Sequence, residues 1–379
     1  MKLTLDVENT VIKRNGKLHL DPFEPENTLV MVGMLDDLGS EDLVTFDHAE
    51  QQPTTEGRAI VQLKLDEASL LIMHNAAHDL VWLWESGFTY EGEIFDTMLG
   101  EYILQRGQKE PLSLEACAER YELDTKKQDT LKAWLNAGNT VRDMNHKELS
   151  DYLSADLHAT QELYNHIDTK LRIYEEHMPL QDTVKLTNQL AVHLAHIYQR
   201  GFAVDLDALE SVRQEYETER DQLAIKLEEQ VRNLMGDRPI NLGSTEQLSW
   251  VIYSRKPKDK KFWAELFEER TNKCTTCDAS GFTYVNSTVV AGLKFFPPTA
   301  KWVSHSGFST SKDSLVFLEG IARSKGMTEA ETFLQSVRRL SAVETYLSSF
   351  IDGIATHTKQ DGKLHVRLLQ HRTGTGRLS

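Results

Sequence analysis

The sequence predicts an α/β domain followed by a mostly α-helical region, and three observations carry this prediction. The first hundred or so residues hold short apolar runs of strand length between turn-forming residues, as at Leu29–Met34 and Leu70–Met73. The second run passes directly into a helical apolar spacing over residues 76–85, and such strand-to-helix junctions are typical of α/β sheets. Beyond Pro179 the apolar residues keep a period near 3.6, which predicts helices.

The totals limit the function classes. At 379 residues the chain is long enough for two or three domains, and 40% hydrophobic with 26% charged residues is typical of a soluble globular protein. A net charge of −16 argues against a protein that coats nucleic acid through bulk positive charge, but it allows a nuclease with an acidic metal site. Three cysteines give no disulfide framework, and the sequence shows no leader and no long apolar run. We therefore expect a cytoplasmic protein, in the host cytoplasm if a phage encodes it.

The chain opens with a strand-like run, Met1–Glu8, that ends in two carboxylates. Side chains two residues apart point to the same face of a strand, so Asp6 and Glu8 share a face. Like charges side by side repel each other, and burial raises their pKa values unless a cation lies between them. A solvated carboxylate pair at the end of a strand is the alternative that these residues alone leave open.

Two later junctions add polar residues in a fixed order. Asn75 follows the run at residues 70–73, and Asp79 is expected in the first turn of the helix after it. A further helix is predicted from His146 to about Tyr174, where Tyr152 and Asp156 are four residues apart and lie on one face. Each pair is common by chance, so only their order and element types give them weight.

The second half is predicted to be helical around one basic segment. Helices are expected at residues 181–200, from an N-cap at Asp205, and across 311–354, before a strand at 363–369. The basic segment has a single acid, Asp259, and five cations: Arg255, Lys256, Lys258, Lys260 and Lys261. It predicts phosphate contact, with an ordinary exposed lysine loop as the alternative.

Two cysteines in the second half resemble half of a zinc knuckle. Cys274 and Cys277 have the spacing of such a pair, but a structural zinc needs four ligands and the sequence holds no second pair. We interpret the surrounding stretch, residues 272–302, as an inserted loop or small β-element.

The four acids and the tyrosine together suit one chemistry. Hydrolysis of a phosphodiester with two metal ions requires several carboxylates to hold hard cations about 4 Å apart. A tyrosine hydroxyl nearby can orient the attacking water.

In this set and order the sequence resembles the 3′–5′ proofreading exonucleases of the DEDD class, tyrosine-containing branch. The resemblance covers Met1 to about Arg172 and implies a ribonuclease-H-like fold with two divalent ions, Mg²⁺ or Mn²⁺. It implies that Asp6 bridges both metals and that Glu8 and Asp156 complete the first site. Asp79 would serve the second metal through water, Tyr152 would position the attacking water, and Asn75 would contact the substrate strand. The family often carries Lys-aromatic before the third acid, where this chain has Ala77-His78.

The rest of the chain resembles family A DNA polymerases of phage type. Five stretches match that family in order: 201–205, 239–244 with Gln247-Leu248, 308–312, 338–346 and 375–379. They resemble the segment after the exonuclease, successive thumb elements and the motif that opens the palm, where Arg377 would bind DNA. The resemblance divides the chain into an exonuclease domain (1–175), a thumb-like helical region (176–360, with an inserted loop around 255–305) and the start of a palm (361–379).

The resemblance also implies partners. The palm aspartates and the fingers helix that would follow in that family are not in the sequence, so we expect no polymerisation by this chain alone. A split polymerase would place them on a second polypeptide, and a processivity factor could join the complex. An artificial truncation or an interrupted gene would give the same sequence.

The sequence therefore predicts a metal-dependent 3′–5′ DNA exonuclease that acts on single-stranded 3′ ends and on primer–template duplexes. One alternative is a stand-alone exonuclease acting on RNA or DNA ends, which a preference for RNA would support. Another is a non-catalytic DNA-binding polymerase subunit, which would show no metal-dependent activity. The retention of mutually repelling carboxylates argues against this second alternative.

Overall fold

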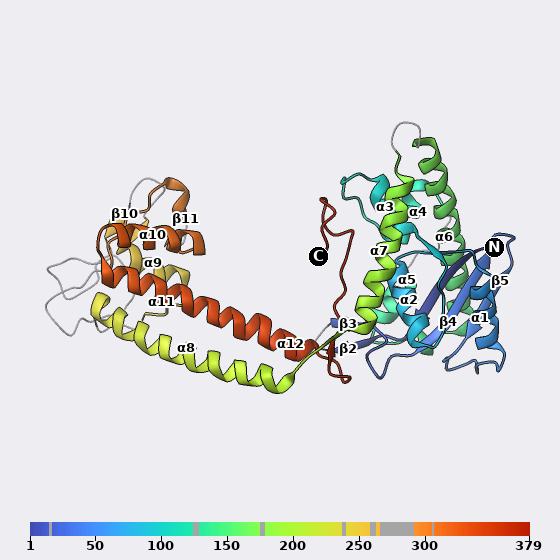
Figure 1. Cartoon of the computed structure of the whole chain (residues 1–379), viewed down its shortest axis with the longest axis horizontal. Coiled ribbons are helices and arrows are strands. Elements are labelled where there is room, and N and C mark those ends of the chain that lie inside the picture. Colours follow the sequence, from blue (N-terminus) through green and yellow to red (C-terminus); the bar gives the residue numbers. More distant parts are fainter. Residues whose placement is uncertain are drawn as a thin grey trace. The chain divides into compact units, whose positions relative to one another are not determined.

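The computed structural model describes residues 1–14, 17–123, 129–174, 179–236, 240–257, 263–265, 292–304 and 307–379. The chain forms two compact units (Figure 1). Unit 1 comprises Met1–Val204 together with His357–Ser379, and unit 2 comprises Asp205–Thr356. Unit 2 is therefore inserted between two parts of unit 1.

Unit 1 is built on a five-stranded mixed sheet with the strand order β5-β4-β1-β6-β7. Its strands are β1 (Lys2–Asn9), β4 (Leu29–Asp36), β5 (Glu41–Thr45), β6 (Leu70–Met73) and β7 (Glu93–Asp96). The pairs β1–β4 and β4–β5 are antiparallel, whereas β1–β6 and β6–β7 are parallel. A small hairpin of β2 (Ile12–Arg14) and β3 (Lys17–His19) follows β1.

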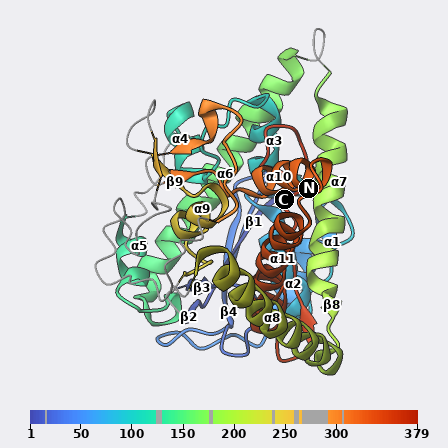
Figure 2. The same ribbon diagram turned by 90° about the vertical axis from the view of Figure 1, so that its left-hand side faces the viewer.

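Helices cover both faces of this sheet (Figure 2). They are α1 (Gly57–Glu67), α2 (Ala76–Glu85), α3 (Thr97–Leu104), α4 (Leu114–Tyr121), α5 (Asp129–Asn136), α6 (His146–Tyr174) and α7 (Gln181–Arg200), with a 3₁₀ turn at Val141–Asp143. The predicted helices from His146 and over residues 181–200 are confirmed. The mixed sheet with flanking helices confirms the α/β part of the predicted fold class.

The side chains of β1 alternate between the two faces of the sheet, and this determines which helices they contact. Leu3, Leu5 and Val7 are buried in the same apolar cluster as residues of α1 and α2. Because neighbouring side chains alternate across a strand, Asp6 and Glu8 point to the opposite face, where α6 packs.

Helix α6 approaches the sheet closely at one glycine of β4. Gly33 is paired with Asp6, and a Cβ atom added to Gly33 would lie 2.8 Å from Leu153 Cγ and 2.8 Å from Leu157 Cδ1. Real Cβ atoms do not come this close to other heavy atoms, so only glycine lets α6 sit at this distance. The close approach brings the polar residues of α6 to the carboxylates of β1.

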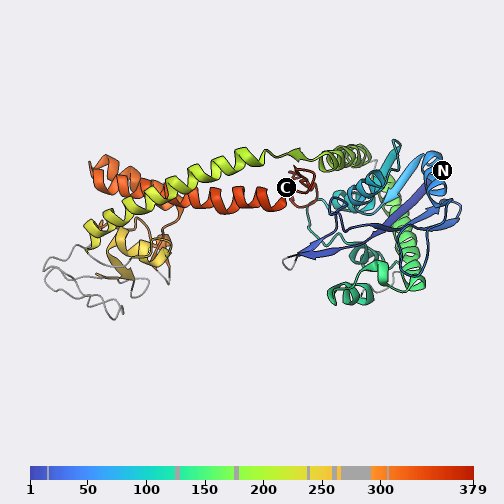
Figure 3. The same cartoon turned by 90° about the horizontal axis from the view of Figure 1, so that it is seen from below.

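Unit 2 is mostly helical, as the sequence predicts. It contains α8 (Leu206–Met235), α9 (Thr245–Tyr253), α10 (Lys312–Ser324), α11 (Thr328–Thr345), a π-helical turn (Tyr346–Ile351) and all but the last residue of α12 (Asp352–His357). Short pieces complete it: β9 (Arg255–Pro257), β10 (Trp263–Glu265), a 3₁₀ turn (Ala300–Trp302), β11 (Val303–Ser304) and β12 (Gly307–Phe308). Helices α8 and α11 run side by side (Figure 3), and Arg339 pairs with both carboxylate oxygens of Glu219 at 2.6 and 2.7 Å. The predicted N-cap is confirmed, since the Asp205 side chain accepts a hydrogen bond from the Ala208 N–H.

After unit 2 the chain returns to unit 1. We call residues 357–379 the returning segment. Its strand β13 (Lys363–Leu364) pairs antiparallel with β8 (Phe202–Ala203). The strand predicted over residues 363–369 is thus only two residues long, because beyond Leu364 the backbone leaves β8 and passes along the face of unit 1 that carries the acids.

Candidate active site

The first two acids lie on the central strand of the sheet. In the ladder between β1 and β4, Asp6 is opposite Gly33 and Glu8 is opposite Met31. Both carboxylates are partly buried and line one cavity of about 730 Å³. The structure thus places them together on the face that the strand period predicts.

The third acid lies at the turn between β6 and α2. Asp79 is in the first turn of α2 and is 2% exposed, and the backbone N–H of Val7 in β1 interacts with its carboxylate. Asn75, the residue before α2, has a left-handed backbone with φ of 68° and lines the same cavity. A non-glycine residue in this conformation needs support from its surroundings.

That support comes from a carboxylate that the sequence reasoning missed. Asp96, at the end of β7, is 1% exposed and accepts hydrogen bonds from the N–H groups of Asn75 (3.0 Å) and Ala76 (2.9 Å). It also accepts from the Met98 N–H (2.9 Å) as the N-cap of α3. Asp96 therefore ties the β6–α2 turn to the start of α3, although burial raises its pKa to about 6.

The fourth acid and the tyrosine come from α6. Tyr152 and Asp156 are one turn apart, and both line the cavity. A hydrogen bond from the Tyr152 hydroxyl lowers the pKa of Asp156, but burial outweighs it and raises this pKa to about 6. Burial and the neighbouring acids raise the pKa of Tyr152, so its hydroxyl keeps its proton at neutral pH.

The acids interact electrostatically with one another. Burial, and then the charge of Asp156, raise the pKa of Asp6 to about 7. Burial raises the pKa of Glu8 well above its usual value, with further contributions from Asp6 and Asp156. Burial and Asp6 likewise raise the pKa of Asp79. All four predicted acids therefore belong to one cluster in which each added negative charge opposes the next.

The donor set of this cluster suits hard divalent cations. It offers several carboxylate groups, the ligand type that Mg²⁺ and Mn²⁺ prefer. Within the described parts of the chain, none of the four acids forms an ion pair with a basic side chain. A bound cation would relieve the mutual repulsion that raises their pKa values, so these residues fit the metal ions that the sequence implies.

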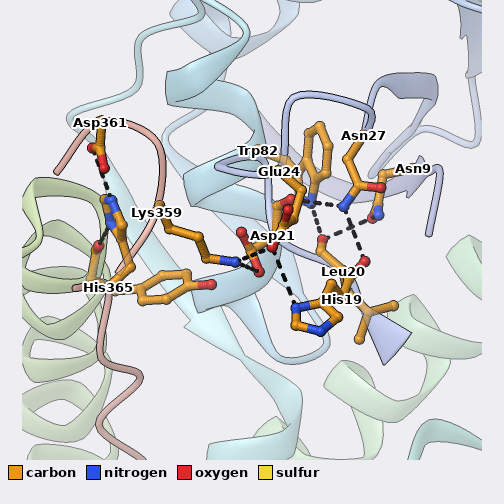
Figure 4. Close-up of polar contacts among 11 residues, drawn as sticks. Asn9, His19, Leu20, Asp21, Glu24, Asn27, Trp82, Lys359, Asp361 and His365 are labelled. Atoms are coloured by element: carbon orange, nitrogen blue, oxygen red, sulfur yellow. Dashed lines mark hydrogen bonds and ion pairs between the residues drawn. The ribbon is translucent and has the colours of Figure 1, made fainter. Parts of the chain in front are cut away.

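A different group has the tightest metal-ligand spacing among the described residues. Ligand atoms of His19, Asp21 and Glu24 all lie within 4.8 Å of one another. The ammonium of Lys359 already pairs with the carboxylates of Asp21 (3.2 Å) and Glu24, as Figure 4 shows. This group is therefore an ion-pair cluster whose cation is a lysine.

The returning segment lines the cavity with residues that the sequence reasoning did not select. Arg367, Leu369, His371, Arg372 and Gly374 line it together with Asp6 and Tyr152. Lys109 contributes a further cation from the loop after α3. The sequence held no local signal for these residues, because roughly two hundred residues of chain separate Arg367 from α6.

The histidine at the position where the resembled family often has an aromatic residue is built into the fold. His78 Nε2 lies 2.9 Å from Asn9 Oδ1. Burial, with a contribution from Arg367, lowers the pKa of His78 to about 3, so its ring is neutral at physiological pH. It connects α2 to the end of β1 on the side of the cavity where the returning segment lies.

Among the remaining predicted binding residues, Arg377 belongs to unit 1 but is not one of the described residues that line this cavity. Arg255 and Lys256 belong to β9 of unit 2, and the Arg377 carbonyl accepts a hydrogen bond from Thr373 Oγ1 (2.8 Å). Lys258, Lys260 and Lys261 lie outside the described residues, as do Cys274 and Cys277. None of the described helices is both long and apolar enough to cross a membrane.

Comparison with known proteins places the first part of the chain. A family model described as 3′–5′ exonuclease, of the DNA polymerase A type, matches residues 25–172. This part of the chain is similar to the 3′–5′ exonuclease domain of family A DNA polymerases. The matched range contains Asp79, Tyr152 and Asp156, and β1 with Asp6 and Glu8 precedes it.

Two relatives extend the comparison. The chain is 27% identical over 194 residues to the DNA polymerase I of Synechocystis sp.; the match covers 50% of this chain and 18% of that protein. A solved structure of the POL domain of Pol1 from M. smegmatis, in complex with DNA primer-template and dNTP, superposes with a TM-score of 0.62 at 18% identity. That match covers 98% of this chain and 50% of the other, and it shows a shared fold across both units.

Proposed function

We propose that unit 1 removes nucleotides from the 3′ end of single-stranded DNA by hydrolysing the terminal phosphodiester, and that it does so as a proofreading activity. The observation that carries the proposal is that Asp6, Glu8, Asp156 and Tyr152 line one cavity, while the buried Asp79 lies close enough to Asp6 for that charge to raise its pKa. This cavity belongs to the part of the chain that an exonuclease family model matches. The reaction forms a bond between a water oxygen and phosphorus and breaks the bond to the 3′ oxygen, which takes up a proton. The products are a nucleoside monophosphate and a shortened strand.

The residues have separate roles in this proposal. Asp6 would hold both metal ions, Mg²⁺ or Mn²⁺, with Glu8 and Asp156 completing the first site and Asp79 serving the second through water. When bound, the two ions supply a nucleophile at neutral pH and stabilise the negative charge on the leaving oxygen. The Tyr152 hydroxyl stays protonated and donates to Asp156, so its oxygen would orient the attacking water by accepting a hydrogen bond from it.

The cavity also offers groups for the substrate strand. Asn75 lies at the turn beside the acids, and Lys109, Arg367 and Arg372 line the cavity with positive charge. Cations at these positions offset the charge of phosphates that enter an acidic site. We assign the backbone of the single strand to this side of the cavity, with the 3′-terminal phosphodiester at the acids.

We further propose that unit 2, including the basic residues from Arg255 to Lys261, acts as a polymerase thumb on duplex DNA, and that residues 361–379 begin a palm. The order of the thumb-like sequence motifs and the shared fold with the Pol1 structure support this assignment. Polymerisation with a second chain carrying palm and fingers, and any processivity factor, remain predictions. Primer extension with and without such a chain tests them.

Product analysis tests the nuclease. The chain and Mg²⁺ are incubated with a single-stranded oligodeoxynucleotide or with its RNA counterpart, and the products are separated by chromatography. We expect 5′-mononucleotides from DNA, none with chelator and none from Asp156→Asn. Release of oligonucleotides would contradict an exonuclease, and faster release from RNA would favour the alternative of an RNA-trimming enzyme.

A further inference from the structure

Residues 19–27 form a loop that is hydrogen-bonded to several elements of unit 1, and we call it the anchor loop. Its backbone is held from three sides (Figure 4). Asn9 Nδ2 and Trp82 Nε1 both donate to the Leu20 carbonyl, at 3.2 and 3.0 Å. Asn27 Nδ2 closes the loop on itself through the carbonyls of His19 (3.0 Å) and Asp21 (2.9 Å).

These contacts connect the loop to the elements that carry the acids. Asn9 ends β1, the strand of Asp6 and Glu8, and Trp82 belongs to α2, the helix of Asp79. Asn9 also contacts His78 at 2.9 Å, so β1, α2 and the anchor loop meet at one polar junction. The position of the anchor loop is therefore fixed relative to the acid cluster.

The side chains of the anchor loop hold the returning segment. The Lys359 ammonium pairs with Asp21 (3.2 Å) and with Glu24, whose side chain is only 4% exposed. Phe23 stacks on His365, with ring centroids 3.6 Å apart and planes 13° from parallel. The His365 ring is fixed further, because its Nδ1 lies 2.7 Å from the Tyr198 carbonyl and its Nε2 lies 3.1 Å from Asp361.

The cavity-lining part of the returning segment begins two residues after this attachment. Arg367 is two residues after His365 and lies over the ring of Tyr198, with its guanidinium 5.5 Å from the ring centroid. Further along, Gln370 Nε2 donates to the Thr187 carbonyl (3.1 Å) and Tyr102 Oη donates to the Thr373 carbonyl (2.8 Å). The segment is thus attached before the stretch that lines the cavity and at two points within it.

We infer that the anchor loop positions the returning segment over the exonuclease cavity, and that Lys359 and His365 are positioning residues for the single-stranded DNA. Neither residue lines the cavity, so each acts through Arg367 and its neighbours. The inference rests on the proposed function only for the identity of the ligand. Loss of the attachment should leave the acids in place and weaken the binding of the strand.

The test compares Lys359→Met with Lys363→Met. Both remove one positive charge from the same segment. The Lys363 side chain is 42% exposed and its ammonium lies 3.9 Å from Asp361, whereas the Lys359 side chain is 16% exposed and its ammonium lies between two carboxylates. We expect Lys359→Met to raise KM for a single-stranded oligonucleotide, and its Kd in the presence of chelator, by about tenfold with kcat unchanged. Lys363→Met should stay within about twofold of the parent protein.

Amide hydrogen exchange separates this inference from the proposed function. Peptides covering residues 365–374 should lose protection in Lys359→Met and keep it in Lys363→Met, whether or not the protein cuts DNA. A third variant, Lys359→Arg, keeps the charge and should restore both protection and KM, which a general folding defect would not allow.

Two results would overturn the inference. One is unchanged protection of residues 365–374 in Lys359→Met. The other is a fall in kcat with KM unchanged, which would place the effect at the acids. Digestion of DNA by the parent protein with no effect of Lys359→Met would leave the proposed function standing and remove only the inference. Absence of digestion by the parent, together with lost protection of residues 365–374 in Lys359→Met, would remove the proposed function and leave the attachment of the segment standing.

Discussion

The tight contact between β4 and α6 gives a prediction that can be worked from distances. In Gly33→Ala the new methyl group would lie 2.8 Å from Leu153 Cγ, where ordinary contacts are 3.4–4.0 Å. A change of χ1 would move Cγ, but a helical leucine has only two favourable χ1 rotamers, and the close-packed contact with β4 leaves little room for the other one. The backbone of α6 must therefore move away from β4 by about 0.6 Å or more.

Two consequences of different size should follow. Overpacking of this kind costs about 1–3 kcal/mol of unfolding free energy. Tyr152 is next to Leu153 in the chain, so the same movement displaces Tyr152 and Asp156 from Asp6 and Glu8. A misplacement of about 1 Å at a reacting centre can cost about 100-fold in rate, and we expect a loss of kcat of about 10- to 100-fold.

The assay is single-turnover hydrolysis of a short single strand at saturating enzyme, with thermal unfolding measured in parallel. Gly320→Ala is the matched control, because a Cβ at Gly320 of α10 meets no atom within 4 Å. It should unfold at the same or a higher temperature and keep the full rate. A Gly33→Ala protein that cuts at the parental rate would refute the argument that this contact sets the position of α6.

Three further predictions follow from the charges and hydrogen bonds of the site. Asp6 has a pKa raised from 3.8 to about 7, so its ionisation destabilises the folded state as pH rises through that range. In chelator, the melting temperature of Asp6→Asn should therefore be several degrees above that of the parent at about pH 8, and the difference should close towards about pH 4. Mg²⁺ should raise the melting temperature of the parent only. A parent that melts at a higher temperature than Asp6→Asn at both pH values would contradict this. Tyr152→Phe should lower kcat by about 10- to 100-fold while the stabilisation by Mg²⁺ in thermal unfolding persists, and an equal loss of metal stabilisation would place the hydroxyl in a metal-binding role instead. Asp96→Ala removes an acceptor shared by the N–H groups of Asn75, Ala76 and Met98. The unfolding free energy of this variant, measured by chemical denaturation, should be about 2 kcal/mol or more below that of the parent. A smaller loss would mean that water replaces the carboxylate as acceptor.

Local patterns predicted much of unit 1. The period of β1 placed Asp6 and Glu8 on one face, and the run ending at Met73 placed Asp79 in the first turn of a helix, because both rest on backbone geometry within a few residues. The spacing of Tyr152 and Asp156 predicted a shared face for the same reason. These are short-range consequences of strand and helix periods, and the structure confirms the elements that carry them.

Long-range features were beyond such patterns. Asp96 belongs to no sequence motif, because its role is to accept hydrogen bonds from the backbone N–H groups of Asn75 and Ala76, about twenty residues earlier in the chain. Arg367 and Arg372 reach the cavity only because the chain leaves unit 1 at Val204 and returns at His357. The role of Gly33 depends on which helix packs above it, and strand periodicity does not specify this.

The most direct test of the account is digestion of a primer–template that is labelled at the 5′ end of the primer and mismatched at its 3′ end. The parent chain is run with Mg²⁺ and with chelator, beside Asp6→Ala. The account predicts a ladder of products shortened one nucleotide at a time from the 3′ end, only with Mg²⁺ and only for the parent. A primer that stays full length with Mg²⁺, or one that Asp6→Ala shortens equally fast, would contradict the assignment of these acids as the nuclease site.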